Sequence, residues 1–139
     1  MDYRKFNDKI LVRLEKGEEI VESIRNLAFK EKIKLGTISG IGAVNKATIG
    51  LFEVDTKEYH TIDLEEDMEI VSLGGNITEK DGEAYIHLHM AVSNSTYNVK
   101  AGHLNSAIIS STGEIFIDII EGSVGRRFDK EAGLNLLEF

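Results

Sequence analysis

One helical segment among a succession of short strand-like runs limits what this chain can fold into. Residues 17–33 place Ile20, Ile24, Leu27 and Ala28 at helical spacing, and glutamates lie early in the segment, where the helix dipole favours acids. The other periodic segments alternate as strands do, or are apolar throughout. In chain order they read KILVRL, LGTISGI, ATIGLFEV, EYHTIDL, MEIVSLGG, AYIHLHMAV, HLNSAIIS and EIFIDII. We therefore predict one main helix and many strands.

Turn-forming pairs separate the strand-like runs, notably Asp81-Gly82 and Thr112-Gly113. Many strands with one helix are typical of an α+β fold, here a mostly antiparallel β-sheet of about seven strands with the helix over one face. The chain contains no linker, low-complexity tract or internal repeat. Residues 1–139 are thus expected to form a single domain.

The segment Ile115–Ile120 is apolar on both strand faces, which indicates a sheet that is covered on both sides. One helix cannot cover two faces of so many strands. The mismatch predicts either a sheet that closes on itself or a homo-oligomer in which a partner supplies the second layer. Of the two, we favour the homo-oligomer.

The composition restricts the kind of metal site and the compartment. Cysteine is absent, so a cysteine-rich structural zinc site is excluded, and any metal must be held by imidazole and carboxylate groups. No stretch approaches the roughly 18 to 20 apolar residues that a membrane helix needs. We therefore expect a cytoplasmic protein without a membrane partner.

Charge argues against direct binding of nucleic acid. The net charge is −8, and basic residues form only small groups at residues 4–5, 30–34 and 126–127. Proteins that bind phosphate backbones do so with clustered lysine and arginine. Direct DNA binding is therefore not expected unless assembly gathers these groups into one surface.

The run AYIHLHMAV places two histidines on the same strand face. By strand alternation Ile86, Leu88 and Met90 share one face, whereas His87 and His89 share the other. The rise per residue puts the two imidazoles about 7 Å apart along the strand. This spacing suits two ligands of one metal ion.

His103 is the third candidate ligand. A strand that returns through a turn at residues 94–97 would bring it beside His87 and His89. Three histidines with an open fourth position are the ligand set of catalytic zinc. Spacing alone leaves open the alternative that these are hydrogen-bonded histidines that pack or face solvent.

Three other features do not point to a site. His60 has no histidine near it in sequence, and we interpret it as structural. SGIGAVN, residues 39–45, begins like a dinucleotide fingerprint, but Asn45 stands at the third glycine position and no helix follows, so a tight connection between strands is predicted. Ser93 and Ser95 lack the histidine and acid that would activate a nucleophile.

Glu69 and Asp118 each share a predicted strand face with apolar residues. An acid buried in such surroundings needs a partner. Each could accept a hydrogen bond from a ligand histidine and so orient it, which is a common role beside metals. A salt bridge is the alternative, above all for Glu69.

The order and spacing of several segments resemble prokaryotic members of the plants-and-prokaryotes-conserved (PPC) domain family. These segments are RLEKGEEIVESI, SGIGAVNKATIGLFE, MEIVSLGGNI, DGEAYIHLHMAVS and AGHL. The resemblance covers nearly the whole chain. It implies an α+β domain in which an antiparallel sheet packs with few helices and which assembles as a homotrimer.

The resemblance includes the histidines. The family's histidine pair and its later Gly-Gly-His-Leu segment match His87, His89 and His103-Leu104, with Ala101 in place of the first glycine. In some prokaryotic members these histidines are metal ligands, usually of zinc. The resemblance thus implies zinc or a similar divalent metal on His87, His89 and His103, accessible to a small-molecule ligand.

Two functions of different classes follow from these observations. The first is a homotrimeric metal-binding protein with a small-molecule binding or hydrolytic role. The alternative is a non-enzymatic DNA-associated or transcription-associated interaction module, because members of the family are often labelled DNA-binding. That label derives chiefly from plant members, which carry a separate basic AT-hook, and this chain has no such segment.

Overall fold

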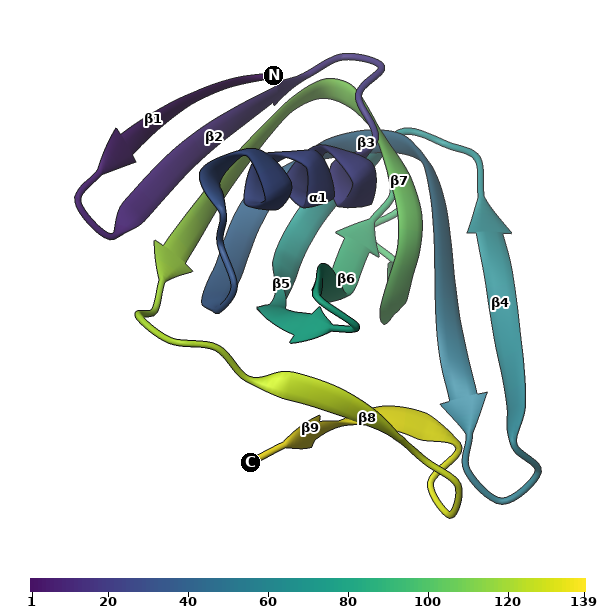
Figure 1. The fold of residues 1–139 in the computed structure, drawn as a ribbon. Coiled ribbons are helices and arrows are strands. Elements are labelled where there is room, and N and C mark those ends of the chain that lie inside the picture. Colours follow the sequence, from purple (N-terminus) through teal and green to yellow (C-terminus); the bar gives the residue numbers. More distant parts are fainter.

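Nine strands and one helix make up the fold of residues 1–139, as described by a computed structural model (Figure 1). In chain order the elements are β1 (Asp2–Phe6), β2 (Lys9–Glu15), α1 (Ile20–Glu31), β3 (Gly36–Glu53), β4 (Glu58–Leu64), β5 (Met68–Lys80), β6 (Glu83–Ser93), β7 (Val99–Ile119), β8 (Gly125–Asp129) and β9 (Leu134–Glu138). All strands belong to one sheet, and every pair except β5 with β8 is antiparallel. The predicted α+β class is confirmed, with nine strands rather than about seven.

The sheet closes on itself through four of its strands. β3 pairs with β5 and β7, and β6 pairs with the same two strands. β2 pairs with the C-terminal part of β7, and α1 lies against β6 and β7 (Figure 1). Apolar side chains from α1 and the strands fill the interior, among them Ile24, Leu88 and Ile117, which are at most 1% exposed. Closure is one of the two arrangements that the pattern predicts.

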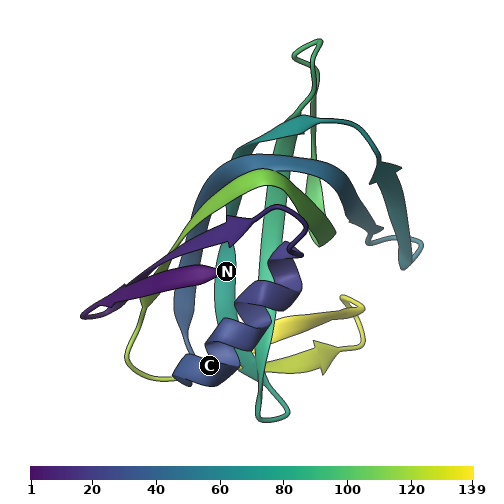
Figure 2. The same cartoon turned by 90° about the horizontal axis from the view of Figure 1, so that it is seen from above.

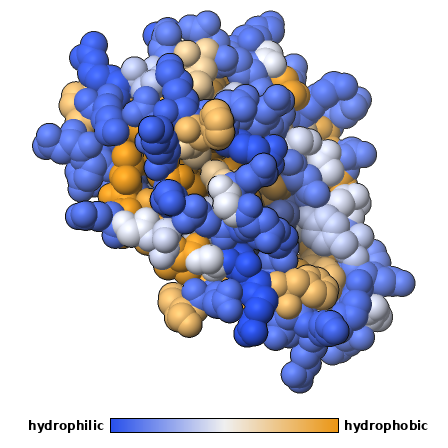
Figure 3. All heavy atoms as spheres, in the orientation of Figure 1, coloured by the Kyte–Doolittle hydropathy of each residue, from blue (hydrophilic) through white to orange (hydrophobic).

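The helix is fixed to the sheet at its first turn. The carboxylate of Glu19 accepts hydrogen bonds from the backbone N–H groups of Val21 and Glu22, and also from that of Ala107 on β7. Lys32, with a left-handed φ of 56°, ends the helix. α1 is neither long nor apolar enough to cross a membrane. The face of the molecule that carries α1 is mainly hydrophilic, with small separate hydrophobic areas (Figure 3).

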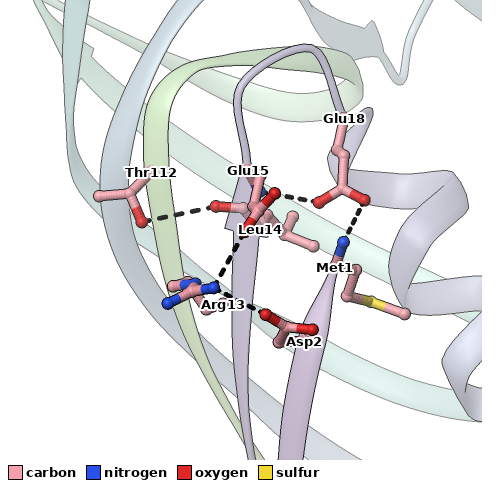
Figure 4. Close-up of polar contacts among 7 residues, drawn as sticks. All are labelled: Met1, Asp2, Arg13, Leu14, Glu15, Glu18 and Thr112. Atoms are coloured by element: carbon pink, nitrogen blue, oxygen red, sulfur yellow. Dashed lines mark hydrogen bonds and ion pairs between the residues drawn. The ribbon is translucent and has the colours of Figure 1, made fainter.

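Polar contacts tie β1 and β2 to the start of the helix (Figure 4). The Met1 amine pairs with the carboxylate of Glu18, which also accepts a hydrogen bond of 2.7 Å from the backbone N–H of Glu15. Arg13 on β2 pairs with Asp2 at 2.7 Å and with Glu15 at 2.9 Å. The groups of the Arg13 pairs are exposed and those of the Met1–Glu18 pair are partly exposed, so each pair contributes little to stability by itself.

Two predicted connections lie inside long strands instead. β7 continues through Thr112 and Gly113, so the turn predicted there is wrong. Residues 39–45 lie within β3, at a bulge between Gly40 and Gly42, and no helix follows them. Gly42 pairs with Gly113, and a Cβ on Gly42 would lie 2.4 Å from the carbonyl oxygen of Thr112. The glycines thus serve a close approach of two continuous strands.

The expectation that Glu69 and Asp118 are buried is wrong. Glu69 is exposed on the same face as Val71, and a bulge between Ile70 and Ser72 places Leu73 on the opposite, buried face. Asp118 is partly exposed and forms an ion pair with Lys9 on the neighbouring strand. Neither carboxylate lies at the histidines, so neither orients an imidazole.

The outer surface of the sheet carries exposed apolar side chains on three adjacent strands. Ile41 on β3 is 58% exposed, Val71 on β5 is 55% exposed and Phe116 on β7 is 49% exposed. We call these three residues the outer patch. Because the closed interior is filled by other side chains, the outer patch takes no part in the core.

Candidate metal centre

His87, His89 and His103 converge on the outer surface of β6 and β7. In the antiparallel register His89 lies opposite His103, and His87 follows two residues away on the same face. The ring centroids are 5.2 Å apart for His87 and His89, 5.1 Å for His87 and His103, and 5.5 Å for His89 and His103. One nitrogen of each ring lies within 4.8 Å of a nitrogen of the other two. All three imidazoles come from one chain.

The alternation of β6 fixes the direction of its two histidines. Leu88, Met90 and Val92 are at most 2% exposed and point into the core, as the sequence predicts. The imidazoles of His87 and His89 therefore point away from the core, where His87 is half-buried and His89 is exposed.

The turn between β6 and β7 sets the pairing that brings His103 into place. The side-chain oxygen of Asn94 accepts hydrogen bonds from the backbone N–H groups of Thr96 at 3.1 Å and Asn98 at 3.2 Å. This turn projects from one end of the molecule (Figure 2). The predicted return through residues 94–97 is thus observed. Ser95 lies in the turn and forms no hydrogen bond with a histidine.

Tyr59 on β4 lies over the strand next to His103. Its ring meets the His103 ring edge-on at a centroid distance of 6.2 Å, and its hydroxyl donates a hydrogen bond of 2.6 Å to Asn105. Gly50 on β3 pairs with His103, and a Cβ there would lie 2.2 Å from the Tyr59 hydroxyl. The absence of a side chain at Gly50 therefore lets the β4 tyrosine reach the histidines.

Arg126 on β8 lies on the other side of the histidines. Its Nη2 is 3.5 Å from Nδ1 of His87 and donates a hydrogen bond of 3.0 Å to Asn76 on β5. Asn76 pairs with His87 in the β5–β6 register. The hairpin of β8 and β9 thus delivers a guanidinium group to the histidines.

The surroundings favour neutral imidazoles. Burial, followed by the proximity of His103, Arg126 and His89, lowers the pKa of His87 from its usual 6.5 to about 4. Burial and the neighbouring His89 also lower the pKa of His103. At neutral pH both rings are therefore uncharged, the form in which a histidine binds a metal.

The geometry fits a divalent metal. Imidazole nitrogens bind zinc at about 2.0–2.1 Å in tetrahedral geometry, so two ligands of one ion lie about 3.4 Å apart. The observed nitrogens lie within 4.8 Å of one another, so side-chain rotations that bring them about 1.4 Å closer or less reach that separation. No carboxylate belongs to the group, so three neutral nitrogens would be the protein's whole contribution.

His60, interpreted from the sequence as structural, lies away from the three histidines and is exposed. Its Nε2 is 3.4 Å from Glu53 and 3.7 Å from Glu58, at the end of the arm formed by β3 and β4. All three side chains are more than half exposed. They form an ordinary surface charge cluster.

The sequence pattern did not reveal Arg126, Asn76 or Tyr59 as neighbours of the histidines. Tyr59 lies in a predicted strand and Asn76 directly follows one, but their positions beside the histidines depend on strand register. Arg126 appears in the sequence only as part of a small basic group, and no strand is predicted for its segment.

Comparisons with known proteins agree with this fold and site. A family model of the Plants and Prokaryotes Conserved (PCC) domain, also abbreviated PPC, matches residues 1–121. A candidate DNA-binding protein from Bacteroides thetaiotaomicron is similar in structure, with a TM-score of 0.97 and 35% identity, over 99% of this chain and 96% of the other. No curated protein matches the chain.

Two archaeal structures are also similar. A metal-containing protein from Archaeoglobus fulgidus has a TM-score of 0.88 and 31% identity, over 100% of this chain and 99% of the other. A plant- and prokaryote-conserved protein from Pyrococcus horikoshii has a TM-score of 0.87 and 32% identity, over 99% of this chain and 94% of the other. The chain belongs to the Plants and Prokaryotes Conserved domain family.

Proposed function

We propose that this protein is a homotrimer that binds a divalent metal, with zinc as the first candidate, through His87, His89 and His103. The observation that carries the proposal is the convergence of three imidazole nitrogens within 4.8 Å of one another, without a fourth protein ligand. A metal held in this way supplies Lewis acidity and open positions for a water molecule or a small substrate. The proposed role is the binding or hydrolysis of a small molecule.

Two further observations support a metal at this site. The lowered pKa of His87 leaves its ring free to bind a metal at neutral pH, without first losing a proton. The similar protein from Archaeoglobus fulgidus is described as metal-containing. Imidazole ligands suit zinc, copper, iron and nickel, so the donor set alone does not select the ion.

Elemental analysis of untagged protein, purified without added metal, tests the proposal. We expect about one zinc or similar ion per chain in the wild type, and loss of that ion in a His87→Ala/His89→Ala double variant. His60→Ala is the matched control, because it removes an exposed histidine from a different surface. A metal-free wild type that takes up no zinc on addition would contradict the proposal, as would a double variant that retains the ion.

The trimeric state is supported by the outer patch. Ile41, Val71 and Phe116 remain about half exposed or more, although the interior of the sheet is complete. Large apolar side chains that stay exposed on neighbouring strands outside the core are typical of protein interfaces. A second copy of the chain is the occupant that we propose, in line with the homotrimer that the family resemblance implies.

A DNA-associated role is the second candidate, because the similar protein from Bacteroides thetaiotaomicron is described as a candidate DNA-binding protein. The basic groups of this chain are not assembled for that purpose. Lys5 pairs with Glu31 at 3.4 Å, Lys34 with Glu79 at 3.5 Å and Arg127 with Glu138 at 3.7 Å. With a net charge of −8 as well, we place this role behind metal binding.

A further inference from the structure

Arg126 is a half-buried cation that neutral groups hold in one position. Its Nε donates to the hydroxyl of Thr78 at 2.8 Å, and its Nη1 donates to the carbonyl oxygen of Asn135 at 2.8 Å. Its Nη2 donates to the side-chain oxygen of Asn76 at 3.0 Å. The guanidinium carbon lies 4.7 Å from the centre of the Tyr85 ring. Thr78 is only 2% exposed, so the position of the guanidinium is well defined.

No carboxylate balances this charge. Arg126 has no acidic group within 4.0 Å, whereas the adjacent Arg127 pairs with Glu138. The histidines add no negative group either, and a divalent metal on them would add two positive charges. A charge that is partly removed from water is costly without a partner of opposite sign, so an anion beside Arg126 would be stabilised.

The guanidinium retains donors for such an anion. It has five N–H groups, of which the protein's oxygens accept three. One N–H remains on each terminal nitrogen, and the one on Nη2 has only a long contact of 3.5 Å to Nδ1 of His87 as its partner in the protein. Two N–H groups are the number that a carboxylate accepts in a bidentate pair.

We propose that the site recognises a small carboxylate, held jointly by Arg126 and by the metal of the three histidines. This inference rests on the proposed metal site and names the substrate class that would bind there. A metal-ligating histidine commonly has a protein carboxylate beside it, and here a cation lies beside His87 instead. The ligand's own carboxylate then supplies the missing negative charge.

The test uses the full-length protein loaded with cobalt(II), whose visible absorption responds to changes in its ligands. Acetate is the probe, acetamide is its uncharged counterpart, and phosphate is the tetrahedral anion for comparison. Arg126→Gln removes the charge, and Arg126→Lys keeps it without the planar fork. Arg127→Gln is the matched control, because it removes an exposed charge from the adjacent position on β8.

We expect saturable spectral changes with acetate and none with acetamide in the wild type and in Arg127→Gln. Arg126→Gln should raise the Kd for acetate at least tenfold, consistent with the loss of a charge-assisted hydrogen bond. The Kd for acetate of Arg126→Lys should lie between those of the wild type and Arg126→Gln. A purely structural role of Arg126 in docking the hairpin would not produce this intermediate value. Cobalt content, measured in every sample, should stay at one ion per chain.

Three results would overturn the inference. Arg126→Gln could bind acetate as the wild type does, the lysine and glutamine variants could be equally weak, or phosphate could bind in preference to acetate. If cobalt is retained in these cases, the carboxylate inference fails and the metal site stands. If the wild type itself takes up no cobalt, the proposed metal site fails and the inference fails with it.

Discussion

His89 on β6 lies directly opposite His103 on β7, with ring centroids 5.5 Å apart and ring planes at 88°. The pair links the site to the register of two antiparallel strands. A shift of that register by one residue would turn one imidazole to the other face of the sheet. The backbone pairing that builds the fold therefore also builds the candidate metal centre.

The stability of the metal-free protein should fall on mild acidification. The pKa of His87 is about 4 in the folded protein and about 6.5 in the unfolded chain, so between these values the unfolded chain binds a proton that the folded protein does not. The contribution of His87 to the free energy of unfolding should therefore be fully present well above pH 6.5. It should decrease as the pH falls from about 6.5 towards about 4. The lowered pKa of His103 acts in the same direction.

Chemical denaturation at a series of pH values measures this effect. We expect His87→Gln to reduce the loss of stability between pH 6.5 and pH 4, because the variant lacks the group whose pKa is lowered. His60→Gln, an exposed histidine on the β3–β4 arm, serves as control and should retain the loss. Identical pH profiles for His87→Gln and the wild type would show that His87 is not the group responsible.

Gly75 should be far less tolerant of alanine than its neighbour Gly74. A Cβ on Gly75 would lie 1.9 Å from the carbonyl oxygen of His87, a backbone atom that cannot rotate away, whereas the nearest atom to a Cβ on Gly74 is 3.9 Å distant. We expect Gly75→Ala to lower the free energy of unfolding by about 1–3 kcal/mol or more. Gly74→Ala should change it by less than about 1 kcal/mol.

Urea denaturation of the two glycine variants compares their stabilities. Since relief of the clash must move β6 at His87, Gly75→Ala should also bind zinc less tightly, as measured by competition with a chelator. Equal stability and equal zinc affinity of the two variants would contradict the packing described for β5 and β6.

The outer patch should control the oligomeric state. We expect light scattering to give the mass of three chains for the wild type. Phe116→Asp should yield smaller species, since it places a charge within the apolar patch of Ile41, Val71 and Phe116. Phe29→Asp is the control, because Phe29 is an exposed aromatic residue on α1, 85% exposed, away from that patch. A wild-type monomer, or a Phe116→Asp protein that remains trimeric, would remove this surface from consideration.

Direct binding to DNA should be absent at moderate salt. Because the net charge is −8 and Lys5, Lys34 and Arg127 pair with acids, we expect no mobility shift of a duplex at 150 mM salt, and at most weak retention at low salt. A complex that forms at low salt and weakens steeply as salt rises would instead indicate phosphate contacts. That result would favour the DNA-associated role.

Local periodicity was sufficient to predict the helix and the two faces of β6. From Leu88 to Val92 the residues that alternate in AYIHLHMAV also alternate in burial, since each strand face has one environment. The same reasoning gave the wrong environment for Glu69, because a bulge in β5 interrupts the alternation without a mark in the sequence. It also placed a turn at Thr112-Gly113, where Gly113 instead permits close packing of β3 and β7.

Contacts between distant segments lay beyond the sequence pattern. The place of Arg126 depends on the docking of a C-terminal hairpin whose strands have five residues each, too short to give a clear periodic signal. Tyr59 reaches His103 across Gly50 because β4 pairs with the far end of β3, a register that composition does not specify. The convergence of the three histidines could be predicted, because His87 and His89 share one strand face and a short turn returns the chain to His103.

The pairing of β2 with the end of β7 has a consequence for synthesis of the chain. Lys9 and Asp118, which face each other across these strands, are 109 residues apart in the sequence. The only other strand that pairs with β2 is β1. During translation the apolar face of β2, with Ile10 and Val12, therefore stays without its cover until most of the chain has left the ribosome. Non-local pairing of this kind slows folding, so completion of the sheet is expected only after β7 has emerged, on a time scale of milliseconds to seconds.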